Sequence, residues 1–390
     1  MSGSSHASPA GSLTAEEQAL VDAASRFARE HVAPGAALWE RARQVPRDAI
    51  RAAARLGLTG IEVPPALGGQ GAGFFAKMRV AEELAKPCMA FAFSLINTHN
   101  VAANIARRGA PQLVERYLAP LLSGEVMGGS ALTEPQAGSD FPAIATTARR
   151  IPGGWAIDGE KAWMTNAAVA EVAVVYAKTD AAQGADGIAA FLVDARAAGF
   201  ERLPPYDLMG GHAIGAGGFR LRDCRVGDEA LLSPPGDAFK TALTSINGAR
   251  IYVAAMCCGM VEEALRSATQ YATRRRTFGK RLIEHQGVRW MLADVATDLE
   301  AARLLTYHAA EILARGENAM LAAAHAKKFA VRMAQQRLGD CLQAMGAEGL
   351  RETYPIGRHI ASARIAGFTD GSTEMQNERI GAMLERNYAS

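Results

Sequence analysis

The spacing of hydrophobic residues changes twice along this chain of 390 residues. Apolar side chains recur at helical spacing from about residue 13 to 124, and helical spacing returns from 239 onward. Between them, short apolar runs follow one another without intervening helices, which favours an antiparallel sheet over alternating βαβ units. The order predicts an α+β protein of several domains, with a helical N-terminal domain, a middle antiparallel β domain and a C-terminal four-helix bundle.

The changes in pattern also give domain boundaries. We expect the N-terminal helical domain over 13–126, the β domain over 127–235 and the helical bundle over 236–390. Residues 1–12 are rich in Ser, Gly and Ala and lack an apolar segment, so they are interpreted as a flexible leader and not as a signal peptide.

Three local signals refine this outline. Thr14 and Glu17 have the spacing of a capping box, which predicts a helix start. Asp158 and Gly159 separate two strand-like runs and predict a hairpin turn between them. Arg250 is expected at the start of the first bundle helix, where a cation opposes the helix dipole, so a merely structural role there is unattractive.

Composition excludes several classes of protein. The chain is 49% hydrophobic and 21% charged with a formal net charge of +2, which is typical of a globular protein and offers no strong positive field for nucleic acid. No apolar run approaches the length that a membrane span needs. The cysteines form no C-x-x-C pair and are odd in number, which favours reduced thiols in a cytoplasmic protein. They are Cys88, Cys224, Cys257, Cys258 and Cys341.

The motifs of P-loop proteins, zincins and α/β-hydrolases are absent from the sequence. Five other motifs carry the information. They are ALTEPQAGSD at 131–140, GEKAWMTN at 159–166, RRRTFGK with EHQ at 274–286, QAMGAEG at 343–349 and DGSTEMQ at 370–376.

Taken in this order, the five motifs resemble those of the acyl-CoA dehydrogenase superfamily of flavoproteins, over about residues 13–387. The resemblance implies an FAD-dependent enzyme that removes two hydrogens from an acyl thioester and gives a 2-enoyl product. It also implies a homo-oligomer, a tetramer or at least a dimer, and an electron-transfer flavoprotein as electron acceptor.

The resemblance assigns the flavin contacts residue by residue. Leu132 and Thr133 would donate to the pyrimidine edge of the isoalloxazine, Trp163 would lie beside the ring, and Thr165 would hydrogen-bond near N5. Taken alone, Trp163 is also typical of a buried core aromatic. Ser139 would contact both the flavin phosphate and the pantetheine of the substrate. The remaining implied contacts in these motifs are Gly138, Ser372 and Glu374.

A second group would reach the FAD of a neighbouring subunit. A guanidinium is suited to a pyrophosphate because its planar fork is permanently charged, although a basic helix end facing solvent is the alternative for the arginines at 274–276. In the QAMGAEG motif, Gly346 would let the backbone approach the cofactor closely, because glycine has no side chain. The residues are Arg275, Thr277, Phe278, Gln286, Gln343 and Gly346.

Asp370 stands where most members of the superfamily carry the glutamate that removes the α-proton. The other known position for this base is occupied by Ala249, so Asp370 is the candidate base, with Ser139, Arg250 and Gly371 on the substrate side. The alternative role for Asp370 is a helix N-cap. An aspartate reaches about 1.5 Å less far than a glutamate, and a misplacement of about 1 Å costs roughly 100-fold in rate.

Three other functions remain open at this point. The one ranked last is a flavoprotein with little dehydrogenase activity that binds a ligand or nucleic acid, because a net charge of +2 is small for a DNA-binding protein. Nitroalkane oxidases, a branch of the same superfamily, use an aspartate at this position, abstract a proton from a carbon acid and return electrons to oxygen. The thioester of an acyl-carrier protein is equally compatible with the motifs as that of CoA. Acyl chain length is not predicted, because Glu374 and the segment Gly210–His212 depart from the common pattern.

Overall fold

The structure, a computed structural model, describes residues 13–389, so the predicted leader lies outside the described residues. Contacts divide the chain into two units. We call the first the bundle unit; it comprises the described residues of Met1–Ser25, Gly73–Lys86 and Asn247–Ser390. We call the second the sheet unit; it comprises Arg26–Ala72 and Pro87–Ile246.

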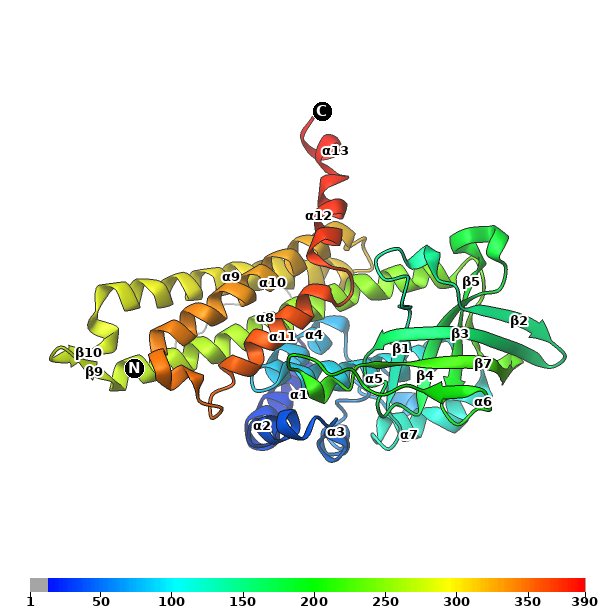
Figure 1. The fold of residues 1–390 in the computed structure, drawn as a ribbon, viewed down its shortest axis with the longest axis horizontal. Coiled ribbons are helices and arrows are strands. Elements are labelled where there is room, and N and C mark those ends of the chain that lie inside the picture. The colour runs from blue at the N-terminus through cyan, green and yellow to red at the C-terminus, as the bar shows by residue number, and fades with distance from the viewer. Residues whose placement is uncertain (1–12, 390) are drawn as a thin grey trace. The chain divides into compact units, whose positions relative to one another are not determined.

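Long helices form the bundle unit (Figure 1). Helices α9 and α10 pack along each other, and α11 and α12 pack on α10. A two-stranded antiparallel ribbon, β9 (Arg276–Thr277) and β10 (Lys280–Arg281), joins α8 to α9. The helices are α1 (Ala15–Phe27), α4 (Phe74–Ala85), α8 (Ala238–Arg274), α9 (Gln286–Ala314), α10 (Met320–Met345), α11 (Ile356–Phe368), α12 (Thr373–Gly381) and α13 (Leu384–Tyr388).

The capping box at the start of α1 is confirmed. The backbone N–H of Thr14 donates to Glu17 Oε2 over 3.0 Å, and the N–H of Glu17 donates to Thr14 Oγ1 over 3.2 Å. Two of the four N–H groups that a helix start leaves unpaired are thereby satisfied.

Helix α4 lies in the N-terminal part of the sequence but packs within the bundle unit. Gly259 of α8 permits this, because a Cβ there would lie 2.2 Å from the carbonyl oxygen of Glu82 in α4. The buried Glu82 carboxylate accepts hydrogen bonds from Arg303 Nε over 2.8 Å and from Tyr307 Oη over 2.6 Å, both on α9. A close backbone approach and a buried ion pair therefore hold α4 on two bundle helices.

The sheet unit contains a mixed sheet with helices against it (Figure 1). The strand order is β6-β7-β3-β2-β4-β5-β8, and β1 pairs with β4. The strands are β1 (Gly128–Ala131), β2 (Thr147–Ile151), β3 (Gly154–Met164), β4 (Val172–Lys178), β5 (Ile188–Asp194), β6 (Phe200–Arg202), β7 (Gly217–Gly227) and β8 (Leu231–Ser233). The helices are α2 (Ala33–Ala42), α3 (Arg47–Ala54), α5 (Met89–Arg108), α6 (Pro111–Leu113) and α7 (Ala119–Leu122).

Strand β4 is buried on both faces, which explains its unbroken apolar sequence. Val172, Val174 and Tyr176 pack in one core cluster, together with side chains of α5 and α7. The alternate residues Ala173 and Val175 pack in a second cluster on the opposite face. The predicted fold class is confirmed, although β1 and β2 pair with β4 in parallel, so the sheet is not purely antiparallel.

The predicted hairpin turn at Asp158-Gly159 is wrong. Strand β3 continues through both residues, and the register with β7 shifts between Ile157 and Gly159, as in a β-bulge. Gly159 is required by close packing, because a Cβ there would lie 2.4 Å from Thr146 Oγ1. The actual turn of this region joins β2 to β3 at Gly153, whose φ is +76°.

Within residues 13–389, no helix combines the length and the apolar character needed to cross a membrane.

Candidate active site

The loop that carries Asp370 lies between α11 and α12 of the bundle unit. Asp370 has a φ of +54° and Gly371 a φ of +93°, so two consecutive residues adopt the left-handed conformation. Glycine adopts it freely, whereas an aspartate does so only at some cost. The chain therefore turns sharply at the residue predicted to be the base.

The helix-cap alternative for Asp370 is not what the structure has. Helix α12 begins at Thr373, and its N-cap is Ser372, whose hydroxyl accepts from the N–H of Met375 over 3.4 Å. The side chain of Asp370 is only partly shielded as a whole, but its Oδ2 is buried and has no hydrogen-bond partner. A buried carboxylate oxygen without a partner is unusual and is available for chemistry.

Side chains from three helices hold the carbonyl groups of this loop. Arg250 Nε donates to the carbonyl oxygen of Asp370 over 3.0 Å. Gln376 Nε2, on α12, donates to the carbonyl oxygens of Gly371 and Ser372 over 3.0 and 3.1 Å. Lys327, on α10, donates to the carbonyl oxygens on either side of Asp370, those of Thr369 and Gly371.

The structure corrects the expected position of Arg250 and adds two residues to the predicted site. Arg250 is not at a helix start, because α8 begins at Ala238. It lies in the middle part of the helix sequence with a buried side chain, so the helix dipole gives no reason against a structural role. Lys327 and Gln376 were not predicted as site residues. Lys327 is the first of two adjacent lysines of α10, and nothing in the local sequence marks it out from Lys328.

Burial and the neighbouring positive charges have opposite effects on the pKa of the Asp370 carboxyl. Burial raises the pKa of the Asp370 carboxyl, and the positive charges of Lys327 and Arg250 oppose this rise. Burial also lowers the pKa of Lys327 to about 8 and that of Arg250 to about 10. The loop therefore combines a shielded carboxyl, which favours proton uptake, with two cations that favour its ionised form.

In the sheet unit, four predicted flavin contacts lie on two neighbouring segments. Leu132 and Thr133 follow β1, and Trp163 and Thr165 lie at the end of β3. The N–H of Ala162 donates to the carbonyl oxygen of Thr133 over 2.9 Å. The structure thus brings these four predicted residues together at one end of two strands.

A buried ion pair fastens the same two segments. Lys161 Nζ is fully buried and donates to Glu134 Oε1 over 2.7 Å and to the carbonyl oxygen of Leu132 over 3.2 Å. Glu134 also accepts from the N–H groups of Ala145 and Thr146. Burial alone would raise the pKa of Glu134, but Lys161 and these donors hold it at about 2. Glu134 and Lys161 lie within the predicted motifs but were not singled out.

Trp163 lies in an unexpected environment for a core aromatic. Its side chain is 60% exposed, its φ is +56°, and its ring centroid lies 4.4 Å from that of Tyr206. Asn166, three residues on, is buried and donates to the carbonyl oxygens of Ser94 and Gly128. The anchored Asn166 therefore fixes the end of a segment that leaves the Trp163 ring exposed. Gly138 and Ser139 are also exposed.

The second group of predicted flavin contacts lies far from Asp370 in the same unit. Arg275, Thr277 and Phe278 follow the end of α8, near the β9–β10 ribbon at the far end of the bundle (Figure 1). Arg250 and the end of α8 at Arg274 are 24 residues apart, which is about 36 Å along a helix. These residues and the Asp370 loop are not brought together within the bundle unit.

Most of this group is exposed. Phe278 is 97% exposed with a φ of +48°, and Arg275, Gln286, Gln343 and Gly346 are exposed as well. Thr277 Oγ1 lies 3.0 Å from His285 Nε2. Gly346 ends α10 with a φ of +59°, and a Cβ there would meet no atom within 4 Å.

Glu374 lies on the first turn of α12 with an exposed side chain. Its own backbone N–H and the Ser372 hydroxyl hold the pKa of the Glu374 carboxyl below its usual range. It is therefore an anion at a helix start, where the helix dipole favours negative charge.

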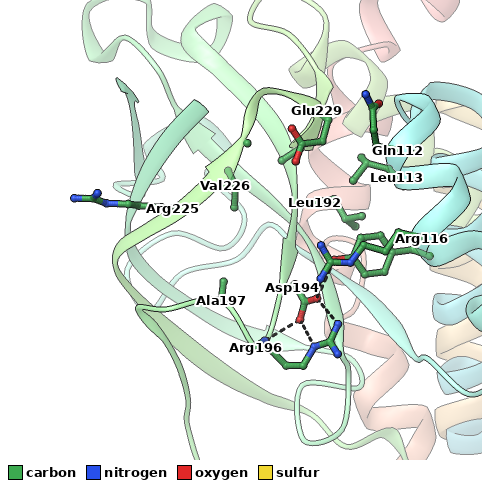
Figure 2. Close-up of a pocket in the computed structure, with 13 residues that line it drawn as sticks. Gln112, Leu113, Arg116, Leu192, Asp194, Arg196, Ala197, Arg225, Val226 and Glu229 are labelled. Carbon is green, nitrogen blue, oxygen red and sulfur yellow. Dashed lines mark hydrogen bonds and ion pairs between the residues drawn. The ribbon is translucent and has the colours of Figure 1, made fainter. Parts of the chain in front are cut away.

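A cavity of about 300 Å³ in the sheet unit contains none of the predicted site residues (Figure 2). Each of its three arginines already has an acidic partner. Asp194 accepts from Arg116, Arg196 and Tyr117, and Arg225 pairs with Asp223. Burial alone would raise the pKa of Asp194, but hydrogen bonds from Arg196 help to hold it at about 2. This cavity therefore offers no unpaired cation to an anionic ligand.

Comparison with known proteins gives the family. Sequence models of acyl-CoA dehydrogenases match the chain over 14–125 (N-terminal domain), 129–224 (middle domain) and 236–384 (C-terminal domain). The short-chain specific acyl-CoA dehydrogenase of Sus scrofa is 34% identical over 366 residues, which cover 93% of this chain and 89% of the relative.

Solved structures agree. Butyryl-CoA dehydrogenase from Megasphaera elsdenii superposes with a TM-score of 0.91 at 31% identity, covering 96% of this chain and 100% of the other. PigA with FAD and proline superposes with a TM-score of 0.88 at 25% identity, covering 96% and 98%. This chain belongs to the acyl-CoA dehydrogenase family and is an FAD-dependent oxidoreductase. The predicted family and the predicted cofactor are confirmed.

The residues present fit FAD. The exposed ring of Trp163 offers an apolar face to a planar ligand, and Thr165 beside it offers a hydroxyl. The exposed Arg275 offers a guanidinium that no other described residue engages, and guanidinium groups suit phosphates. Gly346 leaves room for a close approach.

Proposed function

We propose that this enzyme removes the α-proton and a β-hydride from a short acyl-CoA, with Asp370 as the base. The observation that supports this most is the buried Oδ2 of Asp370, which has no hydrogen-bond partner in a loop held by Arg250, Lys327 and Gln376. Relatives named for short-chain and butyryl-CoA support a short acyl group.

The chain's own residues supply the acid–base part of the reaction. Asp370 accepts the proton from the carbon next to the thioester carbonyl, and its partly dry surroundings raise its proton affinity for that task. When bound, FAD supplies the acceptor for the hydride from the neighbouring carbon. Ser139, Arg250 and Gly371 are proposed on the substrate side, as in the motif resemblance. The flavin contacts proposed are those of the two segments ending in Thr133 and Thr165.

The aspartate itself favours a second candidate. Its shorter side chain is compatible with a nitroalkane-oxidase-like reaction, in which Asp370 abstracts a proton from a nitroalkane and electrons pass to oxygen. A thioester on an acyl-carrier protein is a third possibility, since the proposed chemistry involves only the acyl end.

Anaerobic bleaching of the flavin separates these candidates. The purified yellow protein is mixed with short, branched and aryl acyl-CoAs, and separately with primary nitroalkanes, while the flavin absorbance is followed. We expect an acyl-CoA to bleach it. Bleaching by nitroalkanes alone, with rapid reoxidation in air, would replace the dehydrogenase proposal with the oxidase one. Silence with both sets would favour a carrier-bound substrate or a non-catalytic role.

The role of Asp370 is tested by Asp370→Asn, which keeps the size of the side chain and removes the base. We expect the variant to stay yellow and to be reduced about 10²–10⁴-fold more slowly, the usual contribution of a general base. Glu378→Gln is the matched control, because it removes an exposed carboxylate from α12 nearby. Reduction of Asp370→Asn at the wild-type rate would exclude Asp370 as the base.

We also propose a homotetramer that passes electrons to an electron-transfer flavoprotein, as the family resemblance implies. The separation of about 36 Å along α8 supports an assembly, because a site at the Asp370 loop would need the Arg275 group of another copy. The five cysteines, all within the described residues, are buried and form no disulfide, which supports a reducing compartment such as the cytoplasm.

A further inference from the structure

Lys327 is an unusual residue for the interior of a helix bundle. Its residue surface is 1% exposed, and it lies among small apolar residues of α10. Burying an ammonium group costs free energy unless the protein compensates it. The compensation here comes from backbone carbonyls, those of Thr369 and Gly371. Lys327 thus donates to the carbonyl groups of both residues that flank the proposed base. Its burial at this position indicates a role beyond packing.

Hydrogen bonding alone does not account for the positive charge. Gln376 holds carbonyls of the same loop with a neutral amide. Among residues 13–389, no ion pair within 4 Å joins Lys327 to a carboxylate, and Asp370 is the anion that raises its pKa most. The positive charge of Lys327 therefore acts mainly on Asp370 and does not belong to a structural ion pair.

The other charged and titratable groups of this region can be named. From α8, Arg250 acts on Asp370 and on Lys327, and Cys257 acts on Lys327. From α12, Arg379 acts on Arg250. Arg250 donates to the carbonyl oxygen of Asp370, on the backbone. Lys327 thus shares the role of counter-charge with one other group, on a different helix.

We propose that Lys327 is a positioning residue for Asp370: its ammonium group locks the left-handed turn through the two flanking carbonyls and supplies a positive charge that keeps the carboxylate ready to take a proton. This inference rests on the proposed role of Asp370 as base. It adds a residue to the site that the sequence motifs did not contain.

The electrostatics agree with the geometry. Burial raises the pKa of the Asp370 carboxyl, and the positive charge of Lys327 opposes this rise more strongly than that of Arg250. Without Lys327 the carboxyl would hold a proton to higher pH and would be an ineffective base below that pH. Loss of the cation therefore raises the pKa of Asp370, so the carboxyl titrates at higher pH.

The test measures the titration of Asp370 directly in the FAD-loaded enzyme. Infrared spectra are recorded over a pH series, and the protonated carboxyl band of Asp370 is identified by subtraction of the Asp370→Asn variant. Lys327→Met removes the charge and the donor, and Lys327→Gln removes the charge but keeps a donor for one carbonyl. Lys328→Met is the matched control, because it removes the next lysine of the same helix.

We expect the midpoint for Asp370 to rise by about one pH unit or more in both neutral variants, the effect of losing a nearby opposite charge. The acid limb of flavin reduction by butyryl-CoA should move in the same direction. Lys328→Met should leave both unchanged. If Lys327→Met does not fold, Lys327→Gln carries the test. A wild-type midpoint in the neutral variant would overturn the proposal.

The outcome is distinguishable from a failure of the proposed function. If Asp370→Asn is reduced at the wild-type rate, the base assignment fails, whatever the infrared midpoint shows. If Asp370→Asn is inactive but the Lys327 variants keep the wild-type midpoint and pH profile, the base assignment stands and only the role of Lys327 is wrong. A slower rate at an unchanged midpoint would reduce Lys327 to a structural role and also overturn the proposal.

Discussion

At the scale of single residues, positive φ angles concentrate in the predicted motifs. Within the described residues, six non-glycine residues have them, and three of these are predicted site residues: Trp163, Phe278 and Asp370. Each such conformation costs about 1–3 kcal/mol and persists only where its surroundings impose it. Asn166, in the second motif, is a fourth, although asparagine tolerates this conformation better. Strain is therefore placed where function is proposed.

Arg275 is the residue whose predicted role is most easily tested alone. Arg275→Ala should lose FAD on purification, because the phosphate would lose a bidentate cation. Arg274→Ala is the control; this neighbouring arginine donates to the carbonyl oxygen of Gln270 and is also exposed. The flavin-to-protein absorbance ratio gives the occupancy. Full occupancy in Arg275→Ala would show that the phosphate assignment is wrong.

At the scale of elements, the ends of β1 and β3 depend on one buried ion pair. Lys161 and Glu134 are both nearly inaccessible, and together they connect the segments of Thr133 and Thr165. Breaking such a pair by removing one partner leaves an uncompensated charge inside the protein. The pair therefore holds together the two segments that carry these predicted flavin contacts.

Glu134→Gln should lower the free energy of unfolding by about 3–5 kcal/mol, because Lys161 remains buried without its anion. The double variant Glu134→Gln with Lys161→Met should be more stable than the single one. Because the pKa of Glu134 falls from 4.5 to about 2 on folding, its contribution is present above 4.5 and is lost as pH falls toward 2. Urea unfolding at several pH values measures both effects. A single variant as stable as wild type would contradict this account.

At the scale of the whole molecule, the proposed FAD contacts of one chain cannot all serve one cofactor. About 36 Å of α8 separates the Asp370 loop from the Arg275 group. Phe278, at the far end, exposes almost its whole ring. This exposed ring lies beside the predicted phosphate contacts, which is consistent with the proposed assembly.

Dilution of the holoenzyme should therefore release FAD together with subunits, and Phe278→Asn should do so at higher protein concentration. Asparagine accepts the left-handed backbone of this position, so the subunit itself should not lose stability. Sedimentation followed at the flavin band and at the protein band measures both. A monomer that retains full FAD would contradict the shared site.

The sequence by itself determined the order of domains, the family and the motif residues, because these depend on local periodicity and on short runs of residues. It also predicted the capping box of α1, which involves residues three apart. Tertiary structure decided the rest. The Asp158-Gly159 pair became a bulge because Thr146 packs on it, Ser372 and not Asp370 became the cap of α12, and α4 joined the bundle at Gly259. Lys327 donates to the carbonyl oxygens of Thr369 and Gly371 across 42 and 44 positions of sequence, and no local pattern specifies contacts at that separation.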